Sequence, residues 1–405
     1  MQTNLKINDI INLDIKRMGI NGEGIGFFNR LAIFVDGAIP GEKILAKITK
    51  VYNNRAIAEI DDVLNDSINR TVPICPLFGD CGGCQLQHIK YEKTLEFKKD
   101  IIKKAFLRYI KPAQKINIKN TFSNYQFENY RHEATLPLKQ KDNSFSFGLN
   151  SIKTTDFIKI DHCYVHHLKI NDIYNLITTY INENNITNFS INSVTIKISN
   201  FNGDVLIVFN LNDNNKLDNL IEYLINNNLS IKSIYQNIDN NYQLLYGKDY
   251  IVEKILNTTI KITPNKYLHP NPVLLNDYYQ IIFNYINNIN PESIEIILAD
   301  NQIFYELLID NNQKTIKHQF KSKYNLTKEL EVLYLEPNKS GLNYYSLNQI
   351  LINKPKNIIY SSSNPSTLAK DLNKLKDIYE IKEVIPFDMF PLTSLVESLT
   401  FLKLK

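Results

Sequence analysis

The stretch that decides the architecture of this chain is Cys75-Pro76-Leu77-Phe78-Gly79-Asp80-Cys81-Gly82-Gly83-Cys84, which holds three of the four cysteines in the sequence. The fourth, Cys163, lies far downstream. This economy predicts one four-ligand centre, because four thiolates are the usual ligand set of iron–sulfur clusters and of structural zinc sites. The glycines between Cys81 and Cys84 let the backbone turn tightly, so that its amides can face the sulfur atoms.

Three interpretations of these cysteines are open on spacing alone: an iron–sulfur cluster, a four-cysteine zinc site, or ordinary buried thiols. The polar start of the chain has no signal-peptide pattern, and no apolar run approaches the roughly 20 residues of a membrane span. We therefore expect a cytoplasmic protein without membrane contact. In that compartment cysteines stay reduced and bind metal more often than they form disulfides.

The length and charge of the chain set broad limits. Its 405 residues, of which 43% are hydrophobic, support two or three domains. A net charge of +4 permits an RNA partner without demanding one. We divide the chain into residues 1–62, 63–260 and 261–405, and we expect a monomeric, multidomain α/β protein.

Residues 1–62 predict a small OB-like β-barrel, because short strand-like runs alternate there with glycine-containing turns. The runs are Ile10–Lys16, Leu31–Val35, Lys43–Val51 and Ala56–Ile60. The phrase Phe34-Val35-Asp36-Gly37-Ala38-Ile39-Pro40-Gly41-Glu42 resembles the signature of the TRAM domain, an OB-like RNA-binding barrel. The alternative is a similar barrel that has no ligand.

Residues 63–260 contain the cysteine loop and predict a central α+β domain. Tyr91–Tyr109 has the periodicity of an amphipathic helix. We expect its lysines to face solvent, with phosphate contact as the alternative; they include Lys98, Lys99, Lys103 and Lys104. Asn202-Gly203 and Asn240-Asn241 each indicate a hairpin. Arg131 is a candidate to bind an RNA phosphate, since a guanidinium can donate two parallel hydrogen bonds.

Residues 261–405 alternate strand-like and helix-like stretches, which predicts an open, Rossmann-like α/β sheet. The strand-like stretches include Ile294–Ala299, Leu330–Leu335 and Asn357–Ser361. A helix is predicted at Ser366–Lys376, with its cap at Pro365-Ser366.

Several motifs together resemble the RNA uracil-5 methyltransferases. The loop Cys75–His88 is similar to the cluster loop of that family, and Tyr360–Leu372 and Phe387–Ser398 are similar to its last two motifs. With the TRAM-like barrel they extend over essentially the whole chain, and they are most similar to the branch that acts on 23S ribosomal RNA. The resemblance implies a 4Fe-4S cluster on Cys75, Cys81, Cys84 and Cys163, and an RNA partner, either 23S ribosomal RNA or tRNA.

The resemblance also implies a chemistry. In this family a cysteine thiolate attacks carbon 6 of uracil, and carbon 5 then takes the methyl group of S-adenosylmethionine (SAM). A glutamate removes the proton from carbon 5, and the cysteine leaves.

The chain departs from the family at the reacting groups. The nucleophile position holds Ser363, and the base position holds Glu397. A serine hydroxyl is a poor nucleophile without a strong adjacent base, and Tyr360–Asp371 contains no histidine. We interpret Ser363 as a turn or helix-cap hydroxyl. Glu397, whose usual histidine neighbour is replaced by Leu395, is interpreted as a structural hydrogen-bonding residue.

The SAM site also differs from that of the family. The glycine-rich loop of the family corresponds to Ile296–Phe304, which has no glycine, and none occurs between Gly247 and Gly341. The segment between the family landmarks Leu268–Asn271 and Glu336–Gly341 also looks shorter, as if the SAM fold were trimmed. We therefore expect SAM binding to be weak or lost. The family's SAM-site positions are Asn271, Asp300 and Glu336.

Three hypotheses follow. The first is an RNA-binding 4Fe-4S protein of this family that acts on ribosomal RNA, as an assembly or folding factor, with methyl transfer lost or impaired. The second is an active 23S ribosomal RNA (uracil-C5)-methyltransferase with an atypical site. The third is a redox or oxygen sensor whose cluster tunes RNA binding.

Overall fold

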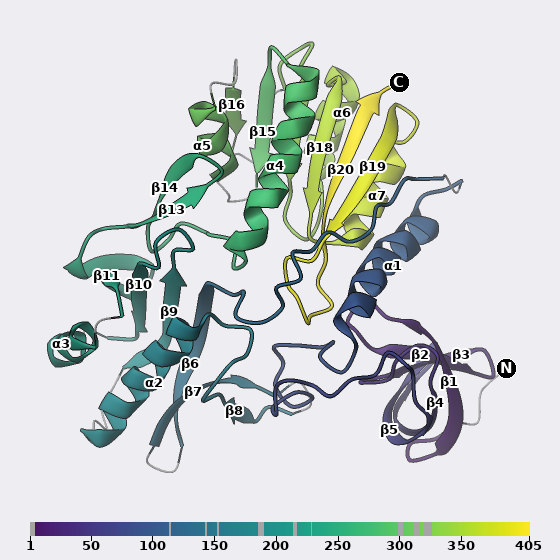
Figure 1. Ribbon diagram of the computed structural model, residues 1–405. Coiled ribbons are helices and arrows are strands. Elements are labelled where there is room, and N and C mark those ends of the chain that lie inside the picture. Colours follow the sequence, from purple (N-terminus) through teal and green to yellow (C-terminus); the bar gives the residue numbers. More distant parts are fainter. Residues whose placement is uncertain are drawn as a thin grey trace.

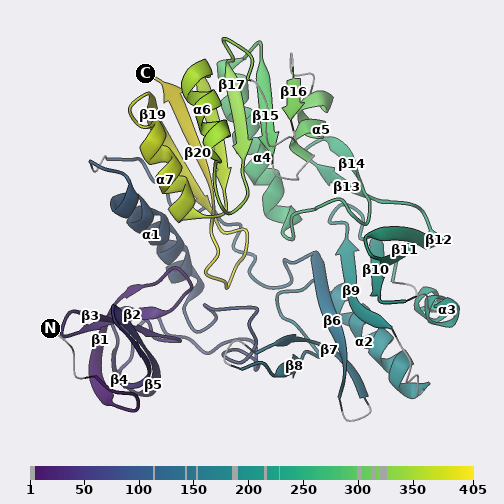
Figure 2. The ribbon, with the colours of Figure 1, turned by 180° about the vertical axis from the view of Figure 1, so that it is seen from behind.

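The computed structural model describes residues 5–112, 115–141, 144–151, 154–184, 190–213, 217–227, 229–298, 303–311, 316–319 and 326–405. An N-terminal barrel, a central sheet and a C-terminal sheet form three separate bodies, and helix α1 (Tyr91–Tyr109) lies between the first and the last (Figure 1). Figure 2 shows the same arrangement from behind. No helix within the described ranges has the length and apolar character needed to cross a bilayer.

The N-terminal body is a closed barrel, which confirms the predicted barrel, and its strand order is β1-β2-β3-β5-β4. Its strands are β1 (Ile10–Met18), β2 (Gly24–Phe28), β3 (Leu31–Val35), β4 (Lys43–Tyr52) and β5 (Arg55–Asn65). The sequence does not predict β2, because glycine disfavours strands. Yet a Cβ at Gly24 would lie 2.5 Å from the Ala38 carbonyl oxygen, and one at Gly26 would lie 2.7 Å from that of Asp14. The glycines therefore allow the backbones to approach closely.

One arginine fastens the barrel to the cysteine segment. Arg70 donates from Nε to Glu42 at 2.6 Å, from Nη2 to Glu42 at 2.7 Å and from Nη2 to the Gly37 carbonyl at 2.9 Å. Glu42 is buried. Burial alone would raise the pKa of Glu42, but the hydrogen bonds from Arg70 and from the Ile39 amide outweigh it and hold the pKa below its usual value.

The central body is a sheet with strand order β12-β11-β10-β9-β6-β7-β8. Both predicted hairpins are confirmed, as β9–β10 and β11–β12. Helices α2 (Leu168–Glu183) and α3 (Asp218–Asn226) pack on the sheet through a shared aliphatic core. The strands are β6 (Glu133–Lys141), β7 (Ser144–Asn150), β8 (Phe157–Lys159), β9 (Ile191–Ile198), β10 (Val205–Leu211), β11 (Ile231–Ile238) and β12 (Asn241–Gly247).

The C-terminal body is an open sheet with strand order β16-β15-β17-β18-β20-β19, and the predicted α/β character is confirmed. The first four strands are parallel and β20 runs antiparallel to them, whereas β19, which is antiparallel to β20, points the same way as the first four. The strands are β15 (Ile294–Leu298), β16 (Ile316–Gln319), β17 (Val332–Glu336), β18 (Asn357–Ser362), β19 (Tyr379–Phe387) and β20 (Glu397–Leu404). A hairpin, β13 (Ile251–Ile255) and β14 (Thr258–Ile262), precedes the sheet.

Helices cover both faces of this sheet (Figures 1 and 2). Helices α4 (Pro272–Ile289) and α5 (Ile303–Asp310) pack on one face, and α6 (Tyr344–Asn353) and α7 (Pro365–Leu375) pack on the other. Helix α7 begins earlier than predicted, at Pro365, because the side chain of Asn364 caps it by accepting from the Ser366 and Thr367 amides.

Helix α1 has the predicted bounds but an unexpected partner. Its apolar residues, among them Ile102 and Phe106, share a core with Leu368 and Leu372 of α7. The prediction that Lys98 faces solvent is wrong, because its side chain is fully buried. The N-terminal half of α1 runs beneath the loop that follows β19, so this position lies in the interior.

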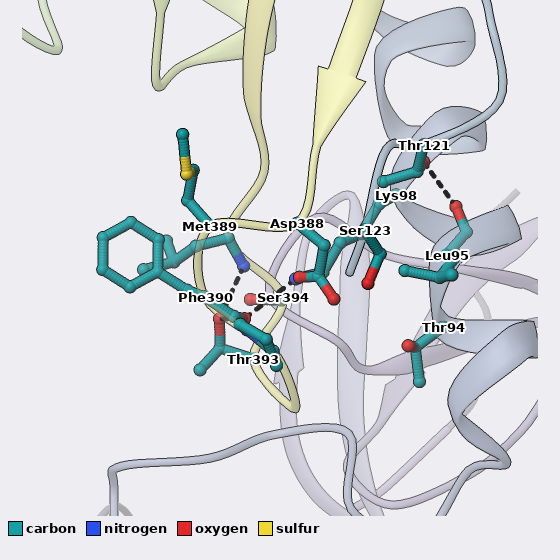
Figure 3. A network of polar contacts seen from close by, with 12 residues as sticks. Thr94, Leu95, Lys98, Thr121, Ser123, Asp388, Met389, Phe390, Thr393 and Ser394 are labelled. Carbon is teal, nitrogen blue, oxygen red and sulfur yellow. Dashed lines mark hydrogen bonds and ion pairs between the residues drawn. The ribbon is translucent and has the colours of Figure 1, made fainter. Parts of the chain in front are cut away.

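A buried ion pair joins α1 to that loop (Figure 3). Lys98 pairs with Asp388, and its Nζ also donates to the Phe390 carbonyl at 2.9 Å. The Tyr91 hydroxyl donates to the second Asp388 oxygen at 2.6 Å. Both charged side chains are 0% exposed, so each is stable in place only while the other neutralises it.

The same loop is hydrogen-bonded to the cysteine segment. The Gln85 and Leu86 amides both donate to the Leu392 carbonyl, at 3.1 and 3.0 Å, and the Ser394 amide donates to Gln85 Oε1 at 3.4 Å. The loop that follows β19 therefore contacts α1 on one side and the cysteine segment on the other.

Replacing Lys98→Ala should lower the free energy of unfolding by about 3–5 kcal/mol, because it leaves Asp388 buried without a counter-charge. Lys103→Ala, on an exposed position of the same helix, is the matched control and should change little. A double variant, Lys98→Met with Asp388→Asn, should recover most of the loss. Urea denaturation measures all three, and equal stability of the two single variants would contradict this account.

Candidate functional site

The four cysteines line one cavity. Cys75, Cys81, Cys84 and Cys163 are all half-buried and free of disulfides. Cys163 comes from the segment before α2. Asn171 holds it there, because its Oδ1 accepts from the Cys163 amide at 2.9 Å and its Nδ2 donates to the Cys163 carbonyl at 3.1 Å. The predicted ligands thus meet at one place although the last lies in a different segment from the others.

Hydrogen bonds shape the loop as its sequence predicts. The Gly83 amide donates to Cys81 Sγ at 3.4 Å, and the Cys75 amide donates to Gln87 Oε1 at 3.0 Å. Gly79 has a φ of +91°, which favours glycine. A short glycine-containing turn therefore directs a backbone amide at a thiol.

The environment of the thiols disfavours their free anions. Burial, followed by the nearby thiols of Cys163, Cys81 and Cys75, raises the pKa of Cys84 to about 12, against a hydrogen bond from Gln87. Thiolates gathered here would need a cation to balance them. Among the residues that the structure describes, however, no group of three or more His, Cys, Asp or Glu is placed to hold a metal ion.

The side chain of His88 lies beside this loop. Its ring packs against Phe78, with centroids 5.3 Å apart, and neither ring nitrogen has a partner in the described part of the chain. Burial, followed by the positive charge of Arg70, lowers the pKa of His88 to about 4. The ring is therefore neutral at physiological pH, and it fills space between Arg70 and the cysteine loop.

Ser363 and Glu397 lie at adjoining ends of two neighbouring strands of the C-terminal sheet, Ser363 directly after β18 and Glu397 at the start of β20. The last pair of the antiparallel ladder is Ser362 with Ser398, so each of the two residues is one position beyond this pair. Ser363 is half-buried in the bend between β18 and α7. No hydrogen bond of its hydroxyl is found within the described residues. The helix cap that the sequence places at Pro365-Ser366 belongs to Asn364 instead.

Glu397 has a partner that sequence reasoning missed. His269 Nε2 lies 3.3 Å from Glu397 Oε1, and His269 Nδ1 accepts from the Asn271 amide at 3.1 Å. Since Nδ1 accepts a hydrogen bond, the proton of the neutral ring sits on Nε2 and is donated to Glu397. The two residues are 128 positions apart, so no local pattern could have joined them.

The candidate SAM positions differ in how the fold uses them. Asn271 is fully buried: its Oδ1 accepts from the Leu274 amide, which caps α4, and its Nδ2 donates to the Met389 carbonyl. Glu336 is half-buried at the carboxyl end of β17, where ligands bind in open α/β sheets. Burial, followed by the carboxylates of Glu336 and Glu397, raises the pKa of Tyr278, whose hydroxyl donates to Ser361 Oγ at 2.6 Å. Asp300 lies outside the described residues.

Arg131, the predicted phosphate-binding residue, lines the cysteine cavity. Its Nε donates to the Glu133 carbonyl at 3.1 Å, and its backbone pairs with the segment after Cys163 through Val165 and His167. The side chain is half-buried. The structure thus places Arg131 beside the cysteines rather than at the strand ends of Ser363 and Glu397, and its contact with RNA stays a prediction.

The stability of the protein should fall in acid because of His88. The ring titrates near 6.5 in the unfolded chain and near 4 in the fold, so below pH 6.5 the unfolded state binds more protons. Stability should decrease as the pH falls from 6.5 to 4, and the whole contribution is roughly 3 kcal/mol. His88→Phe should remove this part of the pH dependence, measured by urea denaturation, whereas the exposed His162→Gln should not. A His88→Phe profile parallel to the wild-type profile would refute the assignment.

Comparisons with known proteins agree with the motifs. Residues 5–60 match the TRAM domain, and residues 317–405 match the tRNA (Uracil-5-)-methyltransferase family. Three relatives are each named an uncharacterized RNA methyltransferase. The one from Bacillus anthracis is 28% identical over 100% of this chain and 99% of its own. Those from Halalkalibacterium halodurans and Clostridium acetobutylicum are each 29% identical, over 96% and 98% of this chain and 95% and 98% of their own.

A solved structure has the same fold. The crystal structure of Pyrococcus abyssi tRNA (uracil-54, C5)-methyltransferase in complex with S-adenosyl-L-homocysteine matches with a TM-score of 0.73. The match covers 96% of this chain and 99% of that one, at 19% sequence identity. The methyltransferase fold expected for the C-terminal body is thus confirmed. The chain thus matches a TRAM domain at residues 5–60 and the tRNA (uracil-5-)-methyltransferase family at residues 317–405.

Proposed function

We propose that this protein binds RNA and has lost efficient methyl transfer. The observation that carries the proposal is at the strand ends of Ser363 and Glu397, where a hydroxyl occupies the nucleophile position and the carboxylate at the base position is engaged by His269. Serine attacks carbon only when an adjacent base takes its proton. His269 cannot serve as that base, because its Nδ1 accepts from a backbone amide and its Nε2 already carries a proton.

The SAM positions support the same proposal. A cofactor contact by Asn271 would compete with the backbone partners at both ends of its amide. The sequence after β15 has no glycine, so the backbone lacks the freedom that lets such loops approach a nucleotide cofactor. Glu336 keeps a carboxylate at the carboxyl edge of the sheet. The described residues therefore fit SAM poorly, and we assign the chain no SAM-dependent step.

The RNA that we propose is 23S ribosomal RNA, because the barrel and the cysteine loop resemble the branch of the family that acts on it. The family description and the solved neighbour name tRNA, which makes tRNA the alternative. The protein would act in the maturation of this RNA, and Arg131 beside the cysteine cavity is the proposed phosphate contact.

A second candidate function is an active uracil-5 methyltransferase. One observation favours it: Glu397 is held at the base position by the buried His269, one residue beyond the Ser362–Ser398 pair. A carboxylate positioned in this way could still remove the proton from carbon 5. The two functions differ in whether 5-methyluridine is made.

We expect the protein to bind 23S ribosomal RNA transcripts with an affinity that falls with added salt and does not change with SAM. Calorimetry with SAM alone should give no binding heat. Incubation of RNA, SAM and protein should yield no 5-methyluridine by mass spectrometry of the digested RNA. Ser363→Ala should bind RNA as the wild type does. Formation of 5-methyluridine by the wild type that is lost in Ser363→Ala would establish the second function instead.

We also infer that the four cysteines hold a 4Fe-4S cluster. What supports this is that they line one cavity, that none is in a disulfide, and that the other three thiols, after burial, raise the pKa of Cys84. When bound, such a cluster supplies a rigid cross-link between the loop of Cys75–Cys84 and the segment of Cys163. A single zinc ion on the same thiols is the competing occupant.

Protein purified without oxygen should contain iron and acid-labile sulfide in equal amounts and absorb visible light, as a 4Fe-4S cluster requires. Cys163→Ser should lose most of this iron and should also lower the melting temperature, because the cross-link is gone. Zinc without iron in the wild type would show that the site is a zinc site. Full iron content in Cys163→Ser would exclude Cys163 as a ligand.

A further inference from the structure

Four outward-facing residues form one row across the barrel. Phe27 of β2 pairs with Ala32 of β3, Ala32 pairs with Arg55 of β5, and Arg55 pairs with Tyr52 of β4. Residues that pair directly across strands project from the same side of the sheet. The residues that follow or precede them on β3 and β5, such as Ile33 and Ala56, fill the barrel core. The row therefore lies on the outer surface.

The two rings in this row are exposed, and each carries a cation. Phe27 is 47% exposed and Tyr52 is 44% exposed. The Arg17 guanidinium carbon lies 5.3 Å from the centre of the Phe27 ring, and that of Arg55 lies 4.9 Å from the centre of the Tyr52 ring. Aromatic rings and guanidinium planes are the surfaces on which unpaired bases stack.

The charge around the row suits a phosphate backbone. The segments Gly24–Val35 and Lys43–Ala58 contain no Asp or Glu. Within the described residues, four cations of these strands and their turns form no ion pair with an acidic side chain; they are Arg17, Arg30, Lys50 and Arg55. The exposed carboxylate of Asp14, on β1 next to Phe27, is paired with Lys16. A surface whose cations outnumber its carboxylates attracts nucleic acid by charge, and its aromatic rings hold bases by stacking.

The two rings of the row also lie outside the contacts that attach the barrel, and both are exposed to solvent. Along β3, the hairpin tip at Asn29-Arg30 is at one end, and the turn that Arg70 fastens through Gly37 and Glu42 is at the other. Tyr52 and Arg55 flank the second hairpin tip, at Asn53-Asn54. The attachment of the barrel to the remainder of the protein therefore leaves the row uncovered.

We propose that Phe27 and Tyr52, with Arg17 and Arg55, form a platform on which two unpaired bases of single-stranded RNA stack. Three strand spacings separate the two rings, about 14 Å along the sheet, which is too far for neighbouring bases of a stacked helix. A splayed strand can span this distance with one base on each ring, and the small Ala32 leaves room between them. This inference rests on the proposed RNA binding and names the form of RNA that the barrel takes.

The test compares a fluorescent oligouridine of about 12 nucleotides, within the site size of OB folds, with an RNA duplex of equal length. The full chain, purified without oxygen, is titrated at several salt concentrations. Phe27→Ala and Tyr52→Ala should each weaken oligouridine binding about tenfold, with the salt dependence unchanged. Arg55→Lys should keep the salt dependence and lose affinity, because an ammonium keeps the charge but cannot stack.

Phe201→Ala is the matched control. This ring is 55% exposed and has Lys254 Nζ 5.8 Å from its centre, but it lies on a hairpin turn of the central sheet. The Phe201→Ala variant should bind oligouridine with the same affinity as the wild type. Melting curves show whether each variant is folded, and all should be, because the changed rings are on the surface.

The outcomes separate the two proposals. Wild-type affinity in both Phe27→Ala and Tyr52→Ala, with oligouridine bound by the wild type, would overturn the platform and leave RNA binding intact. Equal losses for oligouridine and duplex would also overturn it, since the contacts would then be to phosphate. Failure of the wild type to bind any RNA would overturn the proposed function and the platform with it.

Discussion

The buried ion pair between Lys98 and Asp388 is the contact on which the arrangement of the chain depends. It is fully enclosed, so neither partner can be removed without leaving a charge in a medium that cannot solvate it. The pair fixes helix α1 beneath the loop that follows β19. The loop in turn accepts hydrogen bonds from Gln85 and Leu86 through the Leu392 carbonyl. This ion pair thus fixes the positions of the cysteine segment, of helix α1 and of the loop that leads to Glu397 relative to one another.

The barrel is attached by a second charged contact of the same kind. Arg70 reaches Glu42 with two parallel hydrogen bonds, a geometry that fixes direction as well as distance. The contact at the Gly37–Glu42 turn leaves the rings of Phe27 and Tyr52 exposed to solvent. The proposed RNA binding by the barrel requires such a rigid attachment. A flexible attachment would let the barrel move independently of the C-terminal sheet.

Much of this architecture could be predicted from the sequence, because its signals are local. The bounds of α1, the hairpins at Asn202-Gly203 and Asn240-Asn241, and the barrel phrase all depend on residues that are close along the chain. The missed features depend on residues that are far apart. From the sequence alone, Lys98 is predicted to face solvent, because its partner Asp388 is distant along the chain. In the same way, His269 is noticed only as a departure from a family motif, because its contact with Glu397 forms only in the folded protein.

The helix cap before α7 illustrates a smaller error with the same cause. Ser, Asn and Pro all occur at helix starts, and only the backbone shows that Asn364 accepts from the Ser366 and Thr367 amides. The β2 strand was missed for the opposite reason, since its glycines argue against a strand locally but are required by the closeness of neighbouring backbones.

The loop that joins β19 to β20 carries a consequence for how such a protein can change over generations. Its residues Asp388, Phe390 and Leu392 are occupied in holding α1 and the cysteine segment together, whether or not Glu397 ever meets a substrate. Selection for a folded molecule would therefore preserve this motif after selection for its chemistry had ceased. A motif that also has a structural role can be conserved after the reaction is lost. Its presence in a sequence then indicates common descent and not present activity.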